Sequence, residues 1–334
     1  MNNHKLESKQ VSKIKVCVCM VTYNQTLFIE DAIKGVLMQE ADFEIQLVIG
    51  EDCSTDNTRQ ICEHYAKQYP NKIQLLESTK NHGIHKNVFR TIKACQDSTY
   101  IAFCEGDDVW VDKHKLRYQV NLLEANKKFQ AHAHNVTYRN VTTNEDSNFG
   151  ELTDRELSVK DLFMSWPFHV VSLIIRSELI RKIPTDELPH FISCDKFLNM
   201  WVGCHGILMY EGTKFFAIYH RHEFGASGTP NWIQIRQQDL AMLSFLRGYL
   251  NDESLYHEVR LNAIKNLFFA SASIDSPVSI KKWPLLLEFI RFASFTKRTN
   301  IWFFCLILFG RPFYKFVDIL KKPKKLLQPL RFLP

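Results

Sequence analysis

Apolar residues come in short blocks along the first third of this sequence, and polar segments separate them. Four blocks rich in β-branched residues predict strands buried on both faces, at residues 14–22, 45–50, 72–77 and 99–104. The segments between these strands carry apolar residues at helical spacing, at residues 26–39, 54–69 and 86–95. Strands that alternate with helices are typical of βαβ units. The pattern therefore predicts an α/β fold with a mostly parallel sheet flanked by helices.

The pattern changes from Ala131 onward. We predict further strands at residues 131–140, 170–176 and 206–210, with a polar loop at 142–150 and a helix near 194–202. The first of these strands alternates as an antiparallel or edge strand does. Beyond Asn231 the pattern is mainly helical. We therefore expect one α/β domain over residues 1–230 and a helical C-terminal extension over residues 231–334.

Polar side chains follow three of the predicted strands directly. They are Thr22, Tyr23 and Asn24 after the first strand, Glu51 and Asp52 after the second, and residues 105–108 after the fourth. Open parallel sheets bind their ligands at the carboxyl ends of the strands. We therefore expect these side chains to form one site.

Three carboxylates lie close together after the fourth strand, on Glu105, Asp107 and Asp108. Adjacent carboxylates repel each other, and keeping them ionised costs stability unless a cation or a hydrogen-bond donor neutralises them. A hard divalent cation such as Mn²⁺ or Mg²⁺ does this and typically brings substrate phosphates with it. Gly106 allows the backbone to approach a ligand closely. The alternative is a solvated acidic turn, which so short a motif does not exclude.

Three segments together carry a resemblance to a known family. They read VCVCMVTYN at 16–24, LVIGEDCSTDNT at 47–58 and YIAFCEGDDVWVDKHKL at 100–116. In this order they resemble the inverting nucleotide-sugar glycosyltransferases of family 2, of the bacterial surface-polysaccharide type. The resemblance is strong over residues 14–120 and traceable to about residue 225. It implies a GT-A, Rossmann-like fold in which residues 14–125 bind the donor and residues 126–230 face the acceptor.

The same resemblance implies roles for the residues at the first two strand ends. Thr22 and Tyr23 would lie beside the nucleotide base, with Asn24 in the same turn. Asp52 would accept a hydrogen bond from the base or the ribose. The alternative for Asp52 is a turn residue that caps the next helix, although Asp56 can also do this.

The carboxylates after the fourth strand take their roles from the resemblance as well. Asp108 would ligate a Mn²⁺ or Mg²⁺ ion that bridges the diphosphate, and Asp107 would contact the ribose or the metal. Glu105 stands where many members have Asp, and it would still accept hydrogen bonds from the donor.

An inverting transferase needs a general base on the acceptor side. The segment from Phe191 to Val202 resembles the family stretch that carries this base, which makes Asp195 the candidate. Most members have an acid before this Asp, whereas here the residue is Cys194. The alternative is that Asp195 serves only as a helix N-cap.

A second segment, Tyr219 to His222, resembles a family string that contacts the diphosphate or supports the metal. His220 replaces an Arg of that string, so Arg221 would supply the positive charge and His222 would ligate the metal. A basic surface turn explains the same residues. His169 precedes an apolar run on the acceptor side, and we expect a structural role for it.

The composition is that of a folded protein, with 46% hydrophobic and 23% charged residues. Nine cysteines include no paired CxxC framework, so we expect buried free thiols and a reducing compartment. The first 13 residues are polar, and we expect no secretory signal. The longest uncharged apolar run, 301–309, is too short to span a bilayer, which needs about 20 residues.

Positive charge is concentrated near the C-terminus. Residues 281–334 hold 12 Lys or Arg and 2 Asp or Glu, a net charge of +10, while the remaining residues carry −4. Bulky apolar residues lie between these cations, as in helices that bind an anionic membrane surface. We therefore expect a cytoplasmic protein, peripheral at the inner face of the cell membrane, with no nucleic acid partner. The alternatives are a helical layer packed on the domain and a solvated basic extension.

The expected function is transfer of a sugar from a nucleotide diphosphate-sugar, most commonly UDP-sugar in this family, to a saccharide or lipid-linked saccharide acceptor. Alternatives are transfer to a polyprenyl phosphate and a non-catalytic module that binds nucleotide-sugar. A sugar-phosphate nucleotidyltransferase would need a Gly-rich basic loop after the first strand, and the TYNQTLF turn has neither Gly nor a cation.

Overall fold

The computed structural model of this chain describes residues 14–222 and 232–273. The chain divides into two compact units, Met1–Pro230 and Asn231–Pro334. In the described residues, the first unit contains a β-sheet with its helices and the second contains two helices joined by a 3₁₀ turn.

The strands of the described residues form one sheet, in the order β3-β2-β1-β4-β9-β6-β10-β5, with β7 paired to β6 and β8 paired to β10. Their bounds are β1 Lys15–Thr22, β2 Glu44–Glu51, β3 Ile73–Leu75, β4 Tyr100–Phe103, β5 Val109–Trp110, β6 Phe129–Asn140, β7 Glu145–Asn148, β8 Asp154–Leu157, β9 Ile174–Arg176 and β10 Ile207–Arg221. Strands β3, β2, β1 and β4 are mutually parallel. This half confirms the predicted α/β fold.

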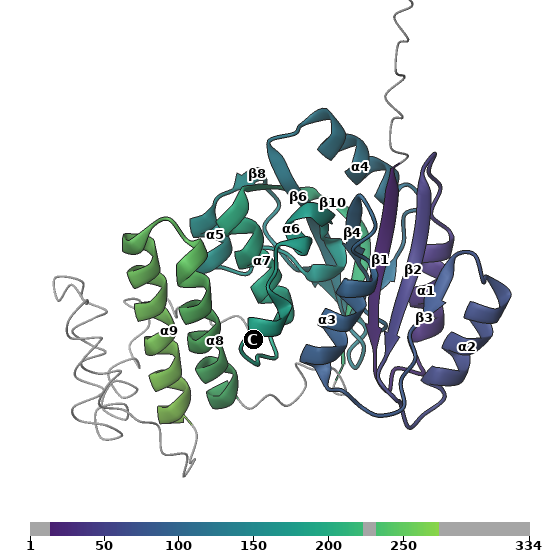
Figure 1. The fold of residues 1–334 in the computed structure, drawn as a ribbon, viewed down its shortest axis with the longest axis horizontal. Coiled ribbons are helices and arrows are strands. Elements are labelled where there is room, and N and C mark those ends of the chain that lie inside the picture. Colours follow the sequence, from purple (N-terminus) through teal and green to yellow (C-terminus); the bar gives the residue numbers. More distant parts are fainter. Residues whose placement is uncertain (1–13, 223–231, 274–334) are drawn as a thin grey trace, which may run out of the picture. The chain divides into compact units, whose positions relative to one another are not determined.

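The helices of the first unit are α1 Ile29–Leu37, α2 Thr58–Gln68, α3 Ile84–Ala94, α4 Lys115–Ala125, α5 Val159–Met164, α6 Ser177–Arg181 and α7 Cys194–His205, with 3₁₀ turns η1 Val170–Ser172 and η2 Thr185–Glu187. Helices α1, α2 and α3 connect the parallel strands as crossovers, which brings the carboxyl ends of β1, β2 and β4 to one edge of the sheet (Figure 1).

Strand β1 is the centre of the hydrophobic core. Val16, Val18 and Met20 are fully buried and belong to the same cluster as Ile33 and Val36 of α1. The residues between them along β1 are also buried. Helices therefore cover both faces of the strand, which explains why its sequence is a continuous apolar run and not an alternating one.

The second half of the sheet is mixed and departs from the prediction in detail. Strand β6 is antiparallel to β7 and β9, which confirms one of the two predicted alternatives, but it lies inside the sheet and is parallel to β10, so it is not an edge strand. Its polar residues His132 and His134 are fully buried. Strand β10 is longer than the predicted 206–210, since its polar positions pair with β6, β8 and β5.

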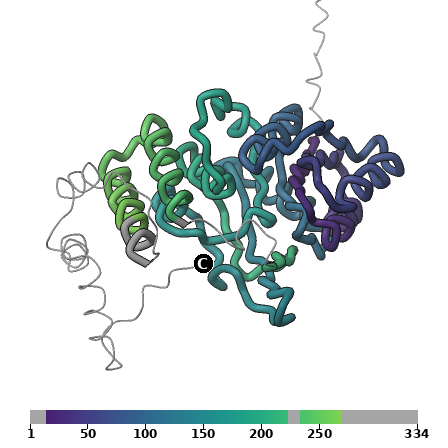
Figure 2. The backbone as a smooth tube through the Cα atoms, turned by 90° about the horizontal axis from the view of Figure 1, so that it is seen from below, coloured from purple at the N-terminus to yellow at the C-terminus, as the bar shows by residue number. Residues whose placement is uncertain are grey.

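The second unit contains α8 Trp232–Leu246, η3 Arg247–Tyr249 and α9 Glu253–Ser273. Helices α8 and α9 lie side by side in both views (Figures 1 and 2), and Arg260 of α9 donates to Ser244 of α8 at 2.9 Å. Among the described helices, none is long and apolar enough to cross a bilayer. The basic segment 281–334 lies outside the described residues.

Gly35 sets the close approach of α1 to β5. A Cβ atom at this position would lie 2.8 Å from the backbone oxygen and 3.0 Å from the backbone nitrogen of Trp110. We expect Gly35→Ala to lower the free energy of unfolding by about 1–3 kcal/mol through overpacking, against a helix-propensity gain of about 1 kcal/mol. Urea unfolding measures this change.

The matched control is Gly248→Ala, because a Cβ atom there meets no atom within 4 Å. An unchanged or higher stability for Gly35→Ala would show that β5 moves aside at little cost.

Candidate functional site

The loop after β4 lies directly against the end of β1. The backbone N–H of Gly106 donates to the carbonyl of Val21 at 3.0 Å, and Asp108 N–H donates to the carbonyl of Glu105 at 3.1 Å. A Cβ atom at Gly106 would lie 2.6 Å from the side-chain oxygens of both Thr22 and Gln25. Only glycine fits at this position, because the side chains at and after the end of β1 lie so close. Gly106 therefore allows the turn that carries the three carboxylates.

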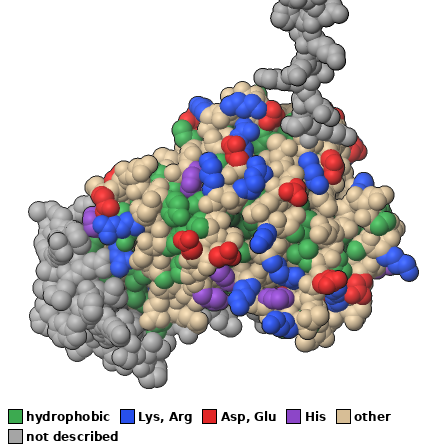
Figure 3. Space-filling model, viewed as in Figure 1, with side chains coloured by type: hydrophobic (Ala, Val, Ile, Leu, Met, Phe, Trp, Pro, Cys, Tyr) green, Lys and Arg blue, Asp and Glu red, His purple; other side chains and the backbone are tan. Residues whose placement is uncertain are grey.

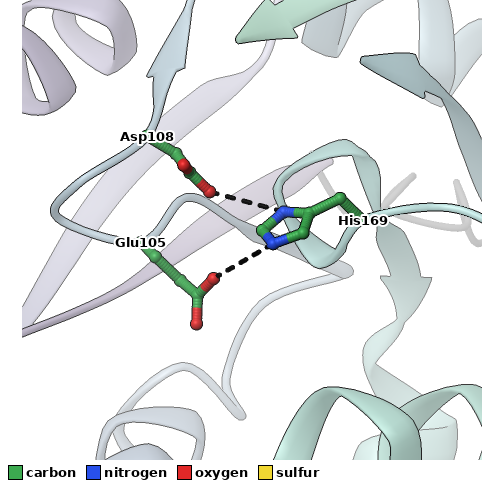
Figure 4. A group of neighbouring side chains, drawn as sticks. All are labelled: Glu105, Asp108 and His169. Atoms are coloured by element: carbon green, nitrogen blue, oxygen red, sulfur yellow. Dashed lines mark ion pairs between the residues drawn. The ribbon is translucent and has the colours of Figure 1, made fainter. Parts of the chain in front are cut away.

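The imidazole of His169 lies between two of these carboxylates (Figure 4). Its Nδ1 is 3.4 Å from Oδ2 of Asp108, and its Nε2 is 4.0 Å from Oε2 of Glu105. One ligand atom from each of the three residues lies within 4.8 Å of the other two. Among the described residues, this is the group of His, Cys, Asp and Glu that could hold one metal ion.

The hydrogen bonding of this group leaves room for a cation. His169 Nδ1 already accepts from the backbone N–H of Val171 at 3.4 Å, so it faces Asp108 Oδ2 as a second acceptor. Asp108 is 1% exposed, and its Oδ2 has no hydrogen-bond partner. Two acceptors that face each other in a buried site need a shared proton or a cation between them. Two carboxylates and one imidazole are a suitable donor set for Mn²⁺.

The electrostatics agree with this geometry. Burial, followed by repulsion from Asp107 and Glu105, raises the pKa of Asp108 well above its usual range. Burial, followed by Asp107 and Asp195, does the same for the pKa of Glu105. Burial lowers the pKa of His169 to about 4, so the ring is neutral, and its Nδ1 lone pair can ligate a cation when the 3.4 Å contact from Val171 N–H is given up. A bound divalent cation would reverse the penalty on both carboxylates.

Asp107 makes its contacts with the end of β10. Its Oδ2 lies 3.1 Å from Nε2 of His222, and its carbonyl oxygen lies 2.7 Å from Nδ1 of His220. The backbone N–H of His220 also donates to Asp108 Oδ1 at 3.1 Å. The ring of Phe28 stacks on both histidines, with centroids 5.5 Å and 4.7 Å away. The structure thus pairs His222 with Asp107, while Asp108 faces Glu105 and His169.

The end of β1 presents one exposed ring beside a fixed turn. Tyr23 is 44% exposed, whereas Thr22 is buried and donates to Gln25 Oε1 at 2.7 Å. Asn24 has a φ of 53°, in the left-handed region, and its Oδ1 accepts from the backbone N–H of Thr55 at 2.8 Å. The side-chain amide therefore joins the β1 and β2 loops.

The acidic pair after β2 is buried and has two separate tasks. Glu51 accepts from Ser54 N–H at 2.6 Å and pairs with Arg59 at 3.3 Å. Asp52 accepts from the backbone N–H of His82 at 2.7 Å and of Gly83 at 2.9 Å. Its carboxylate holds the turn after β3 and not the next helix.

On the acceptor side, Asp195 is the second residue of α7, and Ser193 is the N-cap of that helix. Burial, followed by the charge of Asp195, raises the pKa of Cys194, and Asp195 adds to the burial and the Asp107 charge that raise the pKa of Glu105. Cys194 itself is buried, with its thiol directed at the carbonyl of Phe191 at 3.9 Å. Asp195 is therefore an acid in the first turn of α7 whose charge acts on Glu105 of the carboxylate loop.

From the sequence we expect a structural role for His169, and the structure adds this residue to the carboxylate group. Its position at the start of η1 opposite the β4 loop is a tertiary contact, which a lone His before an apolar run does not reveal. Arg221 is the last residue of β10, half-buried, in register with Asn140 of β6.

A pocket of about 230 Å³ borders the carboxylate loop from the side of α1. It is lined by Leu27, Phe28, Asp31, Asp107, Asp108, Val109, Arg139, Val141, Asn144 and His220. On the face seen in Figure 3, Lys and Arg side chains of the described residues are interspersed with acidic ones.

Comparison with known proteins identifies the family. The model of "Glycosyl transferase family 2" matches residues 17–183. The chain belongs to this family. The family domain thus covers the strands that supply Tyr23, Asp52 and Asp108, together with the turn that supplies His169.

Relatives of the family-2 chain match over part of its length. An uncharacterized protein of Mycobacterium tuberculosis is 31% identical over 62% of this chain and 59% of its own length. The dTDP-rhamnosyl transferase RfbG of Shigella flexneri is 38% identical over 32% of this chain and 37% of its own. The chain thus matches about three-fifths of the length of the mycobacterial relative.

The fold also matches a solved structure. The S. aureus TarS 1-349 structure superposes with a TM-score of 0.64 at 16% identity, over 94% of this chain and 93% of that one. A further structure of that protein is a complex with UDP-GlcNAc, with a TM-score of 0.60 over 84% of this chain and 80% of that one. The likeness confirms the predicted GT-A arrangement of a sheet flanked by helices.

The repulsion within the carboxylate group predicts a pH-dependent stability. Because the pKa of Asp108 is raised, the folded state binds more protons than the unfolded state from about pH 4 up to the raised pKa. We therefore expect the metal-free protein to lose stability as pH rises through this window. Asp108→Asn removes the charge and can donate to His169 Nδ1, so it should gain about 1–3 kcal/mol at neutral pH.

Chemical denaturation in chelator, at about pH 5 and about pH 8, measures both effects. The control Asp146→Asn changes an exposed carboxylate paired with Arg139. A loss of stability in Asp108→Asn at the higher pH would contradict the assignment of an uncompensated buried charge.

Proposed function

We propose that this family-2 chain is an inverting glycosyltransferase that takes its sugar from a nucleotide diphosphate-sugar donor. The observation that carries the proposal is the group formed by Glu105, Asp108 and His169 at the carboxyl end of β4. A buried, negatively charged group with an unpartnered oxygen suits a divalent cation, and such a cation suits a diphosphate.

The donor would lie across the ends of β1, β2 and β4. The exposed ring of Tyr23 offers a stacking surface for the base, and Asp52 retains acceptor capacity beside it. Thr22 and Asn24 shape this turn, and Arg221 would face the diphosphate. TarS binds UDP and UDP-GlcNAc, whereas RfbG is named for a dTDP-sugar. UDP is therefore the first nucleotide to test, with dTDP second.

Mn²⁺ or Mg²⁺ is the proposed cofactor. Glu105, Asp108 and His169 would hold it, with the Asp107–His222 pair beside them. When bound, the ion supplies positive charge that stabilises the leaving nucleoside diphosphate. The residues themselves contribute orientation: His220 fixes Asp108 through its backbone N–H, and Phe28 fixes the ring of His222.

Asp195 is the proposed general base. Its carboxylate would take the proton from an acceptor hydroxyl while that oxygen forms a bond to the anomeric carbon. The bond from this carbon to the phosphate oxygen breaks on the opposite face, and its electron pair leaves with the nucleoside diphosphate. Attack opposite to the leaving group inverts the anomeric configuration. Asp195 is not the N-cap of α7, which supports a role in the site.

The proposed acceptor is a saccharide or a lipid-linked saccharide used in cell-surface polysaccharide synthesis. The names of two further relatives from Bacillus subtilis refer to teichoic and teichuronic acid biosynthesis, which supports this class. Eight described cysteines are free thiols, which supports a reducing, cytoplasmic compartment. Attachment at the inner membrane face belongs to the same proposal and depends on residues 281–334.

Calorimetry with nucleoside diphosphates, each with and without Mn²⁺, tests the donor site. We expect one of them to bind only with the metal, and Asp108→Ala to abolish that binding because it removes a metal ligand. Asp195→Asn should keep the binding and lose transfer by about 100-fold or more. Transfer is followed as nucleoside diphosphate released in the presence of acceptor.

The outcomes separate the alternatives. Metal-dependent donor binding without transfer to any saccharide acceptor, but with transfer to polyprenyl phosphate, assigns the lipid phosphate as acceptor. Binding without hydrolysis or transfer of any kind supports a non-catalytic module. Full activity in Asp195→Asn would show that another group is the base.

A further inference from the structure

We propose that Gln119 and Trp110 are positioning residues, which hold the η1 turn and thereby aim His169 at Asp108 and Glu105. The inference rests on the proposed function for its consequence, since His169 is a candidate metal ligand there. Neither residue belongs to the group formed by Glu105, Asp108 and His169. Both are buried, at 0% and 1% exposure.

The side-chain amide of Gln119 makes three hydrogen bonds, all within the protein interior. Its Nε2 donates to the carbonyl of Ser172 at 2.8 Å and to Nδ1 of His132 at 2.9 Å. Its Oε1 accepts from Nζ of Lys115 at 2.8 Å. Both N–H groups and the oxygen are therefore in use, so the amide has one orientation, and one of its bonds ends on the turn that carries His169.

Trp110 holds the same turn one residue earlier. Its Nε1 donates to the carbonyl of Val171 at 3.0 Å. The ammonium of Lys115 lies 4.1 Å from the centre of its ring, which adds a cation–π contact in a buried environment. Two successive carbonyls of η1 thus receive hydrogen bonds from β5 and α4.

His169 is tied to the turn that these bonds hold. The hydroxyl of Ser172 donates to the His169 carbonyl at 2.7 Å, and the backbone N–H of Ser172 donates to the same oxygen at 3.1 Å. Val171 N–H donates to the His169 ring. Trp110 follows Asp108 by only two positions in the chain. The Asp108 carboxylate and the His169 imidazole are therefore held relative to one another by the chain from Asp108 to Trp110 and by the hydrogen bonds of the η1 turn.

The network continues from Gln119 to a buried carboxylate. Because His132 Nδ1 accepts from Gln119, its Nε2 carries the proton and donates to Glu211 at 2.9 Å. Burial acts to raise the pKa of Glu211, but hydrogen bonds from His132 and Tyr118 outweigh it and lower that pKa. Burial lowers the pKa of Lys115 to about 7. The Lys115 amine and the Glu211 carboxylate are thus joined through the side chains of Gln119 and His132, and so extended a buried polar network is costly for a turn that needed only packing.

Two variants break the hold on the turn, one with an isosteric side chain and one that also makes the aromatic side chain smaller. Gln119→Glu keeps an acceptor for Lys115 but cannot donate to Ser172, and Trp110→Phe removes the indole N–H. The matched control is Trp201→Phe, because Trp201 is equally buried and donates its Nε1 to the carbonyl of Leu179 at 2.9 Å. That bond lies outside the η1 turn, so the control loses one buried hydrogen bond and leaves His169 held.

The first readout is the dissociation constant for Mn²⁺, measured from the paramagnetic resonance of the free ion in the full-length protein. Partners that orient a metal ligand typically contribute about 10–100-fold to metal affinity. We expect Gln119→Glu and Trp110→Phe to weaken Mn²⁺ binding by about tenfold or more. Trp201→Phe should change it by less than about twofold, despite a similar loss of thermal stability.

The second readout needs no metal. Long-range ¹H–¹⁵N spectra of labelled histidine should show His169 as a single tautomer with the proton on Nε2 in the wild type, assigned by its loss in His169→Gln. Both variants should show a mixture of tautomers or a shifted resonance. If wild type binds no Mn²⁺, the metal role fails, and this spectrum still decides the positioning role.

The proposal is overturned if both variants fold with the Mn²⁺ affinity and the His169 spectrum of the wild type. It is also overturned if Trp201→Phe weakens Mn²⁺ binding as much as they do. Should Gln119→Glu fail to fold, Trp110→Phe decides the result by itself.

Discussion

The mutual repulsion of buried carboxylates is the constraint on which this site depends. Glu105, Asp107 and Asp108 follow a strand in the middle of the sheet, where burial and repulsion disfavour negative charge on Glu105 and Asp108. The protein neutralises part of that charge itself, since His222 lies on Asp107 and the backbone of His220 donates to Asp108. The oxygen of Asp108 that faces His169 is left without a partner. The fold thus stores an unfavourable electrostatic arrangement that a cation can relieve, and this is typical of functional sites.

The elements around the carboxylates divide the work of holding them. Gly106 lets the loop lie against β1, and Phe28 of the β1–α1 connection stacks on the histidines that end β10. On the other side, the η1 turn is held by donors that come directly after the loop in the chain, from Trp110 and Gln119. Strain is also present, because Asn24 and Cys53 both have positive φ angles in the loops that border the donor side. A rigid frame of this kind holds the binding side chains in place before a ligand arrives.

The first half of the fold could be predicted from the sequence because each of its elements has a strong local signal. The buried run of β1 and the helical spacing of α1 are visible without tertiary information. The interior position of β6 could not be predicted, since buried His132 and Asn135 resemble the polar face of an edge strand until their partners Gln119 and Gly212 are known. His169 escaped for the same reason, as its meaning lies in two carboxylates about sixty residues earlier in the chain. The order of the motifs was enough to predict the acidic loop. The place of His169 beside that loop depends on contacts between segments that are distant in the sequence.

The place of β10 in the sheet has a consequence for how the protein is made. This strand lies between β6 and β5, although it is the last strand of the described chain, so the sheet is incomplete until residues 207–221 have been synthesised. Until then Asp107 and Asp108 have neither the ring of His222 nor the backbone donor of His220. Contacts so distant in sequence form slowly, because the entropy of loop closure must be overcome first. A nascent or truncated chain would thus contain the family motifs of the first strands without the contacts from β10 that hold Asp107 and Asp108. Ligand binding at the carboxylates would in turn stabilise the pairing of β10, the last described strand to be synthesised.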